Sequence, residues 1–214
     1  MPNSPASVFP VVLDLQVPAG ILGPDPVTFN VHCFLVPHES GVLLVDTGTP
    51  GSDTALAAAL AQIGASWSDV TDVVLTHAHF DHTGGLPGVL AAAPSARVWA
   101  GEQDIPAIDG RGHAVFALRD GDHIRTLTAL ATPGHTLGHV SLLDEAASLL
   151  LVGDLVGVMG GTLSRAPGVF TADAAAAEKS LHRVGALNLD RVLFSHGAEL
   201  ADGPVALKAL ADHL

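Results

Sequence analysis

Basic residues are scarce in this chain of 214 residues. It has nine Lys and Arg against 22 Asp and Glu, the first of the nine is Arg97, and the formal net charge is −13. Proteins that bind nucleic acids do so through clustered Lys and Arg side chains, which contact the phosphates. The few dispersed basic residues argue against a nucleic-acid partner and disfavour a metal-dependent nuclease.

Cysteine and long apolar runs are also scarce. The single cysteine, Cys33, cannot form an internal disulfide, and its apolar surroundings predict a place in the core rather than a reactive thiol. No stretch reaches the roughly 18 apolar residues of a membrane span, and the positively charged start of a secretory signal is missing. We expect a cytoplasmic protein with no membrane partner.

Hydrophobic residues, by contrast, are plentiful at 48% of the chain, which is enough to bury a sizeable core. No shift in composition marks a linker. We therefore expect a single domain over residues 1–214.

The run His77-Ala78-His79-Phe80-Asp81-His82 holds four potential metal ligands in six residues, a density that packing cannot explain. It follows the apolar segment 72–76 and precedes a helix-start pattern at 83–85. In an extended chain His77, His79 and Asp81 point the same way, and His82 joins them if the chain turns into the helix. One metal can take the first two histidines and a neighbouring metal can take Asp81 and His82. Imidazole and carboxylate ligands suit zinc, iron or manganese.

Three further candidate ligands are distant in sequence. His135 lies in a Pro-Gly-His-Thr turn, while Asp154 and His196 each follow a buried strand-like run. The carboxyl end of a strand is where such folds often place functional side chains. A lone histidine after glycine is ordinarily a turn or core residue, and a lone aspartate a cap or turn former. The six-residue cluster favours ligands instead, because a metal bound there needs more of them.

An internal repeat is suggested by segments 42–77 and 149–196. Each reads as a strand ending in aspartate, an Ala-rich helix and a strand ending in histidine. This predicts two βαβ-containing halves that face a shared cleft, although any strand–helix–strand unit in an Ala-, Val- and Leu-rich chain looks similar. The second copy carries the Gly-rich insertion Gly157–Gly168, which we expect to be irregular and to form a rim of the substrate cleft.

Periodicity predicts helices and strands in alternation with short turns, which implies mixed sheets with helices on their outer faces. Strands are predicted near 8–17, 28–37, 42–46, 72–76, 96–100, 123–131, 139–144, 148–153 and 191–195. Helices are predicted near 52–64, 84–93, 172–186 and 203–213. The segment 101–121 has no clear period, so we expect it to border the cleft or cover an edge.

With these motifs in this order, the chain resembles the metallo-β-lactamase-fold hydrolase superfamily from Asn30 to His196. The resemblance implies an α+β fold, namely an αββα sandwich of two mixed β-sheets flanked by helices, with metals in a cleft at one edge. It assigns seven ligands to two metals. These are His77, His79 and His135 for the first, Asp81, His82 and His196 for the second, and Asp154 as a bridge.

Within that superfamily, the histidine directly after the motif aspartate is similar to the glyoxalase II and acyl-homoserine-lactonase branches. Segment 76–85 is especially similar to the lactonase form, and true zinc β-lactamases usually differ there, which argues against β-lactam hydrolysis. The chain has no tyrosine, so the tyrosine that assists lactone opening in characterised lactonases has no counterpart of its own type.

The expected function is hydrolysis of an ester, thioester or lactone of a small molecule by a metal-bridging hydroxide. Two divalent ions about 3.5 to 4 Å apart can share and ionise a water, with zinc the first expectation and iron or manganese the alternatives. Asp81 is the expected catalytic residue, which orients the hydroxide and passes a proton to the leaving group. A homodimer is compatible with the sequence.

Supporting roles are expected for three more residues. Asp46 and His139 are expected behind the ligands, where a carboxylate can fix a histidine's tautomer. A turn role for Asp46, beside Thr47 and Gly48, is the alternative. Arg165 is expected to meet an anionic group of the substrate, with a solvated loop arginine as the alternative. The remaining histidines are expected to be structural or to lie at the surface: His32, His38, His113, His123, His182 and His213.

Two other functions stay open. One is a persulfide dioxygenase of the same fold with His77, His135 and Asp154 around a single iron. The other is a non-catalytic binding protein that keeps the fold.

Overall fold

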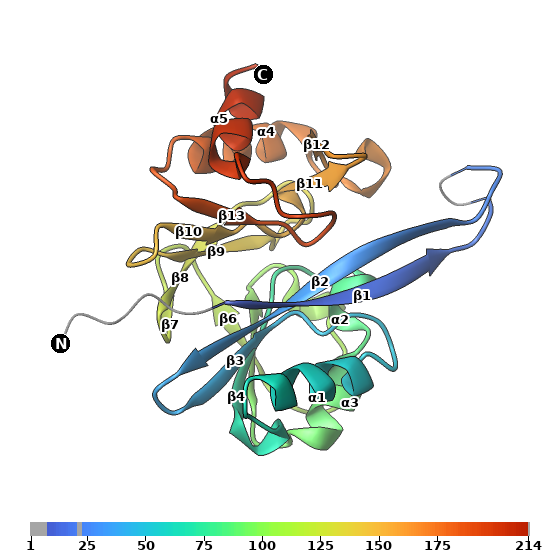
Figure 1. Ribbon diagram of the computed structural model, residues 1–214, viewed down its shortest axis with the longest axis vertical. Coiled ribbons are helices and arrows are strands. Elements are labelled where there is room, and N and C mark those ends of the chain that lie inside the picture. The colour runs from blue at the N-terminus through green and yellow to red at the C-terminus, as the bar shows by residue number, and fades with distance from the viewer. Residues whose placement is uncertain (1–7, 21–22, 214) are drawn as a thin grey trace.

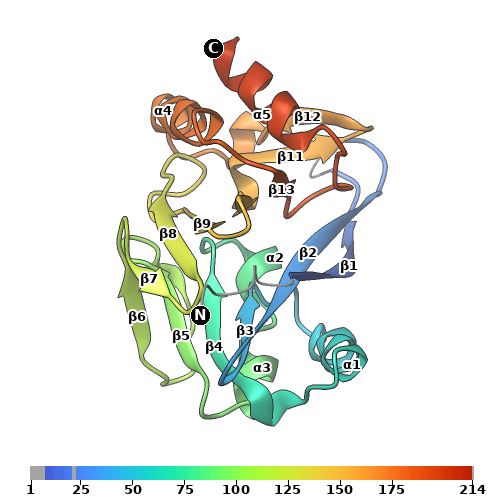
Figure 2. The same cartoon turned by 60° about the vertical axis from the view of Figure 1, so that its left-hand side comes forward.

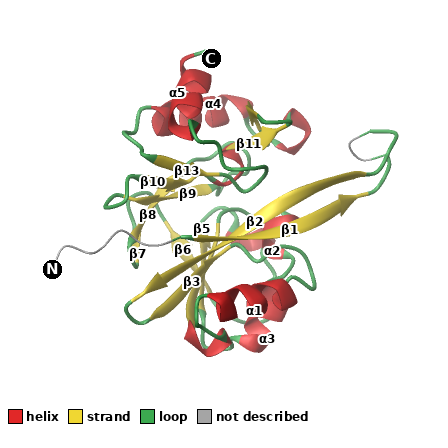
Figure 3. Ribbon diagram, in the orientation of Figure 1, coloured by secondary structure: helices red, strands yellow, loops and turns green. Residues whose placement is uncertain are grey.

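Two mixed β-sheets pack face to face with helices outside each, in a computed structural model that describes residues 8–20 and 23–213. In Figure 1 the layers run from α4 (Ala174–Gly185) and α5 (Gly203–Asp212) at the top, through the sheets, to α1 (Asp53–Gln62) and α3 (Leu86–Ala92) at the bottom. Figure 3 shows the same order, with strands between the two groups of helices. The predicted αββα sandwich is confirmed.

The first sheet has six strands in sequence order. The first three are antiparallel neighbours, and the third to the sixth are parallel. The short helix α2 (Phe80–Thr83) precedes α3 between the fourth and fifth strands. The strands are β1 Phe9–Val17, β2 Val27–His38, β3 Gly41–Val45, β4 Val70–Leu75, β5 Arg97–Gly101 and β6 Val115–Leu118.

The second sheet has five strands in the order β13-β10-β9-β8-β7. Only β10 and β13 are parallel among its neighbouring strands. A separate two-stranded hairpin lies between β10 and α4 in sequence. The strands are β7 His123–Ile124, β8 Leu127–Ala131, β9 Val140–Asp144, β10 Leu149–Leu151, β11 Val156–Met159, β12 Thr162–Arg165 and β13 Arg191–Leu193.

Three apolar layers hold the molecule together, because successive residues of a strand face opposite sides of its sheet. Leu44 packs under α1 and α3, and its neighbour Leu43 packs between the sheets. In the second sheet Leu151 faces the same central layer, while Leu150 packs under α4 and α5. Figure 2 shows α4 and α5 on the outer side of this sheet. Both faces of the inner strands are thus buried, which explains their continuous apolar runs. Cys33 is fully buried in the α1 layer, as predicted.

The repeat is visible in the topology. The series β2, β3, α1, β4 and the series β9, β10, α4, β13 each consist of an antiparallel hairpin followed by a helical crossover to a parallel strand. The two halves therefore bring the ends of corresponding strands to the same region of the molecule, where polar residues follow them.

The prediction that the insertion Gly157–Gly168 is irregular was wrong. It contains most of the β11–β12 hairpin, whose two-residue turn is Gly160-Gly161 with φ of 58° and 81°. Two residues with positive φ are what a type I′ hairpin turn requires, and glycine supplies them at least cost. The glycines that suggested irregular chain are therefore the turn of a regular element.

Other differences from the predicted elements are smaller. The strand predicted over 123–131 is divided into β7 and β8 by a turn at Arg125, whose φ is 56°. Segment 101–121 contains β6, which extends the edge of the first sheet. All four predicted helices are present, with ends that differ from the predicted ones by at most two residues. None of the described helices has the length and apolarity needed to cross a membrane.

A buried carboxylate ties the two sheets together at the amino end of β4. The side chain of Asp72 is fully buried and accepts hydrogen bonds from Arg125 Nε at 2.7 Å and Trp99 Nε1 at 2.9 Å, with Arg97 3.0 Å away. Arg125 lies in the β7–β8 turn of the opposite sheet. Burial alone would raise the pKa of Asp72, but the hydrogen bonds from Trp99, Arg125 and Thr71 outweigh it, so this pKa lies below its usual value.

We predict that Asp72→Asn lowers the free energy of unfolding at pH 7 by about 1 to 3 kcal/mol, because charged partners would lose their acceptor. The lowered pKa means that the carboxylate stabilises the fold fully above the ordinary aspartate value of about 3.9, and that this stabilisation is lost as the pH falls through the folded-state pKa. Urea unfolding should show the gap between wild type and variant narrowing below about pH 4. The exposed Asp109→Asn, paired with Arg111, is the control; an equal effect there would contradict the prediction.

Candidate metal centre

All seven predicted ligands lie together at the ends of strands from both sheets. Residues 77–82 follow β4, and the chain turns into α2 at Phe80, which brings Asp81 and His82 back toward the centre as the sequence predicts. The other three follow β8, β10 and β13. The side chains form three overlapping groups, namely His77, His79 and His135; His77, His82 and Asp154; and Asp81, His82 and His196.

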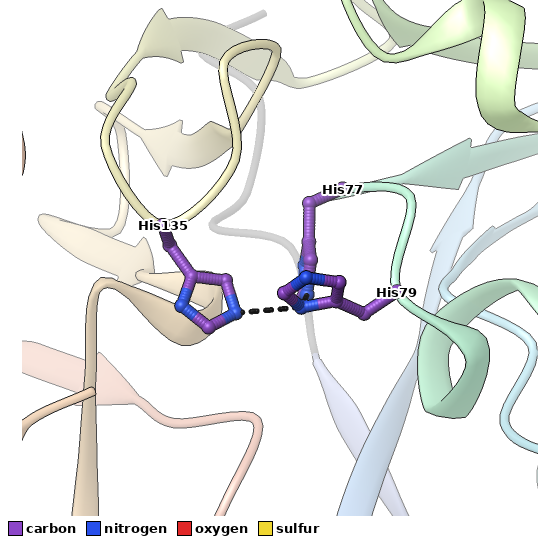
Figure 4. Close-up of side chains that lie close together, drawn as sticks. All are labelled: His77, His79 and His135. Atoms are coloured by element: carbon purple, nitrogen blue, oxygen red, sulfur yellow. Dashed lines mark hydrogen bonds between the residues drawn. The ribbon is translucent and has the colours of Figure 1, made fainter. Parts of the chain in front are cut away.

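The first ligand set is His77, His79 and His135, which Figure 4 shows turned toward one another. His79 Nδ1 lies 3.1 Å from His77 Nε2 and 2.9 Å from His135 Nε2. The three rings are nearly perpendicular in pairs, at 80° to 84°. Nitrogens bound to one tetrahedral zinc lie roughly 3.3 Å apart, so this set can hold a single metal ion.

The second ligand set is Asp81, His82 and His196. Asp81 Oδ2 lies 3.3 Å from His196 Nε2 and 3.7 Å from His82 Nε2. His82 is fully buried, whereas Asp81 and His196 are each 20% exposed. The set can hold a second metal ion that still faces solvent on one side.

Asp154 lies between the two sets. Its Oδ2 is 3.5 Å from His135 Nε2 and 3.1 Å from His196 Nε2, and its Oδ1 is 3.3 Å from His82 Nε2. One carboxylate thus faces a histidine from each set, and this is the position that a bridging ligand requires.

Two buried atoms indicate that the centre fits divalent metal ions. Among the described residues, five buried side-chain atoms lack a hydrogen-bond partner, and His82 Nε2 and Asp154 Oδ1 are two of them. Buried polar atoms nearly always find a partner, and a cation between them would satisfy both. The nitrogen and carboxylate donors are those that zinc, iron and manganese accept.

Asp46 supports His82 from behind. Its Oδ2 lies 2.8 Å from His82 Nδ1, and its two oxygens accept hydrogen bonds from the Thr76 N–H and hydroxyl at 2.8 Å each. Because the Nδ1 proton of His82 is held by this carboxylate, Nε2 is the atom that would bind a metal. Asp46 therefore lies where the sequence predicts it, and also forms the turn after β3 with a φ of 59°.

His139 contacts Asp154 through the backbone and does not belong to either ligand set. Its Nδ1 lies 2.9 Å from Thr132 Oγ1, and its Nε2 accepts the Asp154 N–H at 3.0 Å. A Cβ on Gly153, whose φ is 65°, would lie 2.5 Å from His139 Nε2. The Asp154 backbone is thus positioned by a histidine that only glycine at position 153 allows so close.

Arg165 lies near the metal centre, and its guanidinium is paired with a carboxylate. It ends β12 and lines a cavity of about 300 Å³ that His135 also borders. Its guanidinium donates to Glu178 at 2.8 Å, and both side chains are about half exposed. The predicted contact with an anionic substrate group stays an untested prediction.

Asp104 is a functional residue that the sequence did not reveal. It is nearly buried and accepts hydrogen bonds from Ala78 N at 2.8 Å, Thr136 Oγ1 at 2.6 Å and Gly138 N at 2.7 Å. It therefore ties the loop of His77 and His79 to the loop of His135. Its place just after β5, like that of other site residues after their strands, was an available signal.

The pKa values of the histidines are shifted in opposite directions in the two sets. Burial, with His82 nearby, holds the pKa of His77 well below its usual value, and burial lowers the pKa of His135 to about 3. Burial alone would lower the pKa values of His82 and His196, but neighbouring carboxylates outweigh it, raising the pKa of His82 well above its usual value and that of His196 to about 10. The same pairs hold the pKa of Asp154 well below its usual range, although burial alone would raise it.

The chain is similar in sequence and in structure to known proteins. A family model described as the metallo-beta-lactamase superfamily matches residues 26–196. A metallo-beta-lactamase family protein from Thermus thermophilus is similar in structure, with a TM-score of 0.69 and 25% identity over 95% of this chain and 79% of that one.

Two curated relatives are similar in sequence. The uncharacterized protein YobT of Bacillus subtilis is 32% identical over 64% of this chain and 66% of its own length. A hydroxyacylglutathione hydrolase of Aeromonas salmonicida is 32% identical over 79% of this chain and 61% of its own length. The chain thus spans less than two thirds of the length of either relative.

We predict that Asp104→Asn weakens metal binding at the first ligand set by about 10- to 100-fold, the usual effect of losing a group that orients ligands. The amide nitrogen that replaces one oxygen cannot accept the hydrogen bonds from Ala78 or Gly138. Competition with a chelator measures the affinity. Glu102→Gln, two residues away and exposed in an ion pair with Arg119, should bind as the wild type does; a matching loss there would refute a specific role for Asp104.

We also predict that metal uptake by the second ligand set releases about two protons per chain near pH 7, because ligand histidines must be neutral. The raised pKa values of His82 and His196 mean that both carry protons in the metal-free protein, so affinity should rise with pH. His77 and His135 are already neutral and release none. Titration calorimetry in buffers of different ionisation enthalpy measures this release, and uptake without any proton release would contradict the charges assigned here.

Proposed function

The chain belongs to the metallo-beta-lactamase superfamily, and we propose that it is a binuclear metal-dependent hydrolase that cleaves an ester, thioester or lactone bond of a small molecule. The observation that carries the proposal is Asp154, whose carboxylate faces both ligand sets. Members of this superfamily are mostly hydrolytic metalloenzymes, and one relative is a hydroxyacylglutathione hydrolase. That name supports a thioester among the candidate substrates.

We propose zinc as the metal in both sets, with iron or manganese as alternatives. Bound divalent ions lower the pKa of water toward neutrality and polarise a carbonyl oxygen. His77, His79 and His135 would hold one ion, Asp81, His82 and His196 the other, with Asp154 between them. Asp46 and His139 keep the ligand atoms of His82 and Asp154 in place.

Asp81 is the proposed proton carrier. Burial alone would raise its pKa, but the hydrogen bond with His196 and the charge of His82 outweigh it, so the pKa lies below its usual value. The group is therefore a carboxylate at neutral pH, able to accept a proton from an attacking water. Its 20% exposure leaves it within reach of a leaving group to which that proton can pass.

The second ligand set supports this proposal over a mononuclear iron persulfide dioxygenase, which would use only His77, His135 and Asp154. Three buried or half-buried ligands on the other side of Asp154 have no role in that reaction. A non-catalytic binding protein is disfavoured because neither set lacks a member.

We predict that His82→Ala and Asp154→Ala each remove most of the bound metal and lower turnover by more than about 100-fold, since loss of a ligand costs more than loss of the group behind it. Metals per chain are measured on protein purified without added metal, and turnover on a panel of esters, thioesters and lactones. The exposed His113→Ala is the control. Full activity in either ligand variant, or oxygen uptake with a glutathione persulfide, would overturn the proposal.

A further inference from the structure

A groove with one apolar wall begins at the first ligand set. It has a volume of about 360 Å³, and His79 and His135 form part of its wall. The loop after β5, the loop of His135 and the segment after β12 enclose it. If the bond to be cleaved lies at the metal centre, the neighbouring atoms of the substrate therefore lie against this groove.

Three large apolar side chains line the groove and are open to solvent. Leu137 is 58% exposed, Val169 is 81% exposed and Phe170 is 38% exposed. An exposed apolar cluster of this kind commonly marks a site where a ligand covers it. Together with Ala107 and Ala172 these residues form an apolar wall, and the uncharged polar residues Gln103, Thr136 and Thr171 complete the lining beside Asp104 and the two histidines.

Charged partners for a ligand are lacking around it. Asp104 is the charged residue among those that line the groove, and its carboxylate is already occupied by three hydrogen bonds. Arg165, in the neighbouring cavity, donates to Glu178. Among the described residues that line either cavity, no cationic group is left unpaired for an anionic arm.

We propose that this groove holds an uncharged apolar arm of the substrate, an aliphatic or aromatic acyl group, while the bond to be cleaved lies at the ligand sets. The inference rests on the proposed hydrolase function and narrows its substrate class. Covering the exposed apolar side chains of the wall favours binding, because it removes apolar surface from water. A charged arm would lose its hydration there without gaining a partner, which disfavours its binding.

Binding of simple thiols tests the proposal without turnover, because a thiolate can bind the metal while its chain enters the groove. The probes are ethanethiol, 1-pentanethiol and 5-mercaptopentanoate, titrated into cobalt-loaded protein and followed by the visible absorption of the cobalt. We expect 1-pentanethiol to bind at least about tenfold more tightly than ethanethiol, since each buried methylene favours binding. We expect 5-mercaptopentanoate to bind at least about tenfold more weakly than 1-pentanethiol, because its carboxylate finds no partner.

Val169→Lys should reduce the preference for 1-pentanethiol over 5-mercaptopentanoate at least about fivefold, as it adds a cation to the wall. Val205→Lys is the matched control, because Val205 is 69% exposed on α5 outside the groove lining. Ethanethiol binding should be the same in all three proteins. Equal affinities for the two longer thiols, or equal effects of the two lysines, would overturn the groove assignment alone. Failure of ethanethiol itself to bind would overturn the open metal centre and the proposed function with it.

Discussion

A buried carboxylate between two groups of histidines is the constraint that the rest of this site serves. Asp154 has His82, His135 and His196 around it, and burying such a charge is tolerated only when it is paired. The loop that carries it turns at Gly153, and its N–H is fixed by a histidine from another strand. Asp154, His82, His135 and His196 follow four different strands, and the four-layer packing brings the ends of these strands together.

Much of the fold followed from the sequence because burial on both faces leaves a plain pattern. Runs such as 42–45 are apolar without interruption, and the three apolar layers explain them. The candidate ligands that the structure brings together were equally visible, since each follows such a run. The β11–β12 hairpin was missed because glycine favours an irregular loop and a tight hairpin turn alike, and only the pairing of Met159 with Thr162 distinguishes the two.

The residues behind the ligands were harder to predict. Asp46 could be proposed because the repeat placed it beside the centre, whereas Asp104 contacts groups 26 to 34 residues away through backbone N–H groups and a hydroxyl. Such contacts leave no periodic pattern, because any residue can supply a backbone N–H. The groove was invisible for a related reason: its walls come from four segments that only the folded chain brings together.

The repeat has a consequence for how the molecule is held together. His77, His79, Asp81 and His82 belong to the first half, whereas the other three ligands belong to the second. Neither half contains a full coordination sphere, so each ion would act as a cross-link across the seam. If the two halves were made as separate fragments, they would bind an ion tightly only after associating with each other. Ion binding would then report that association.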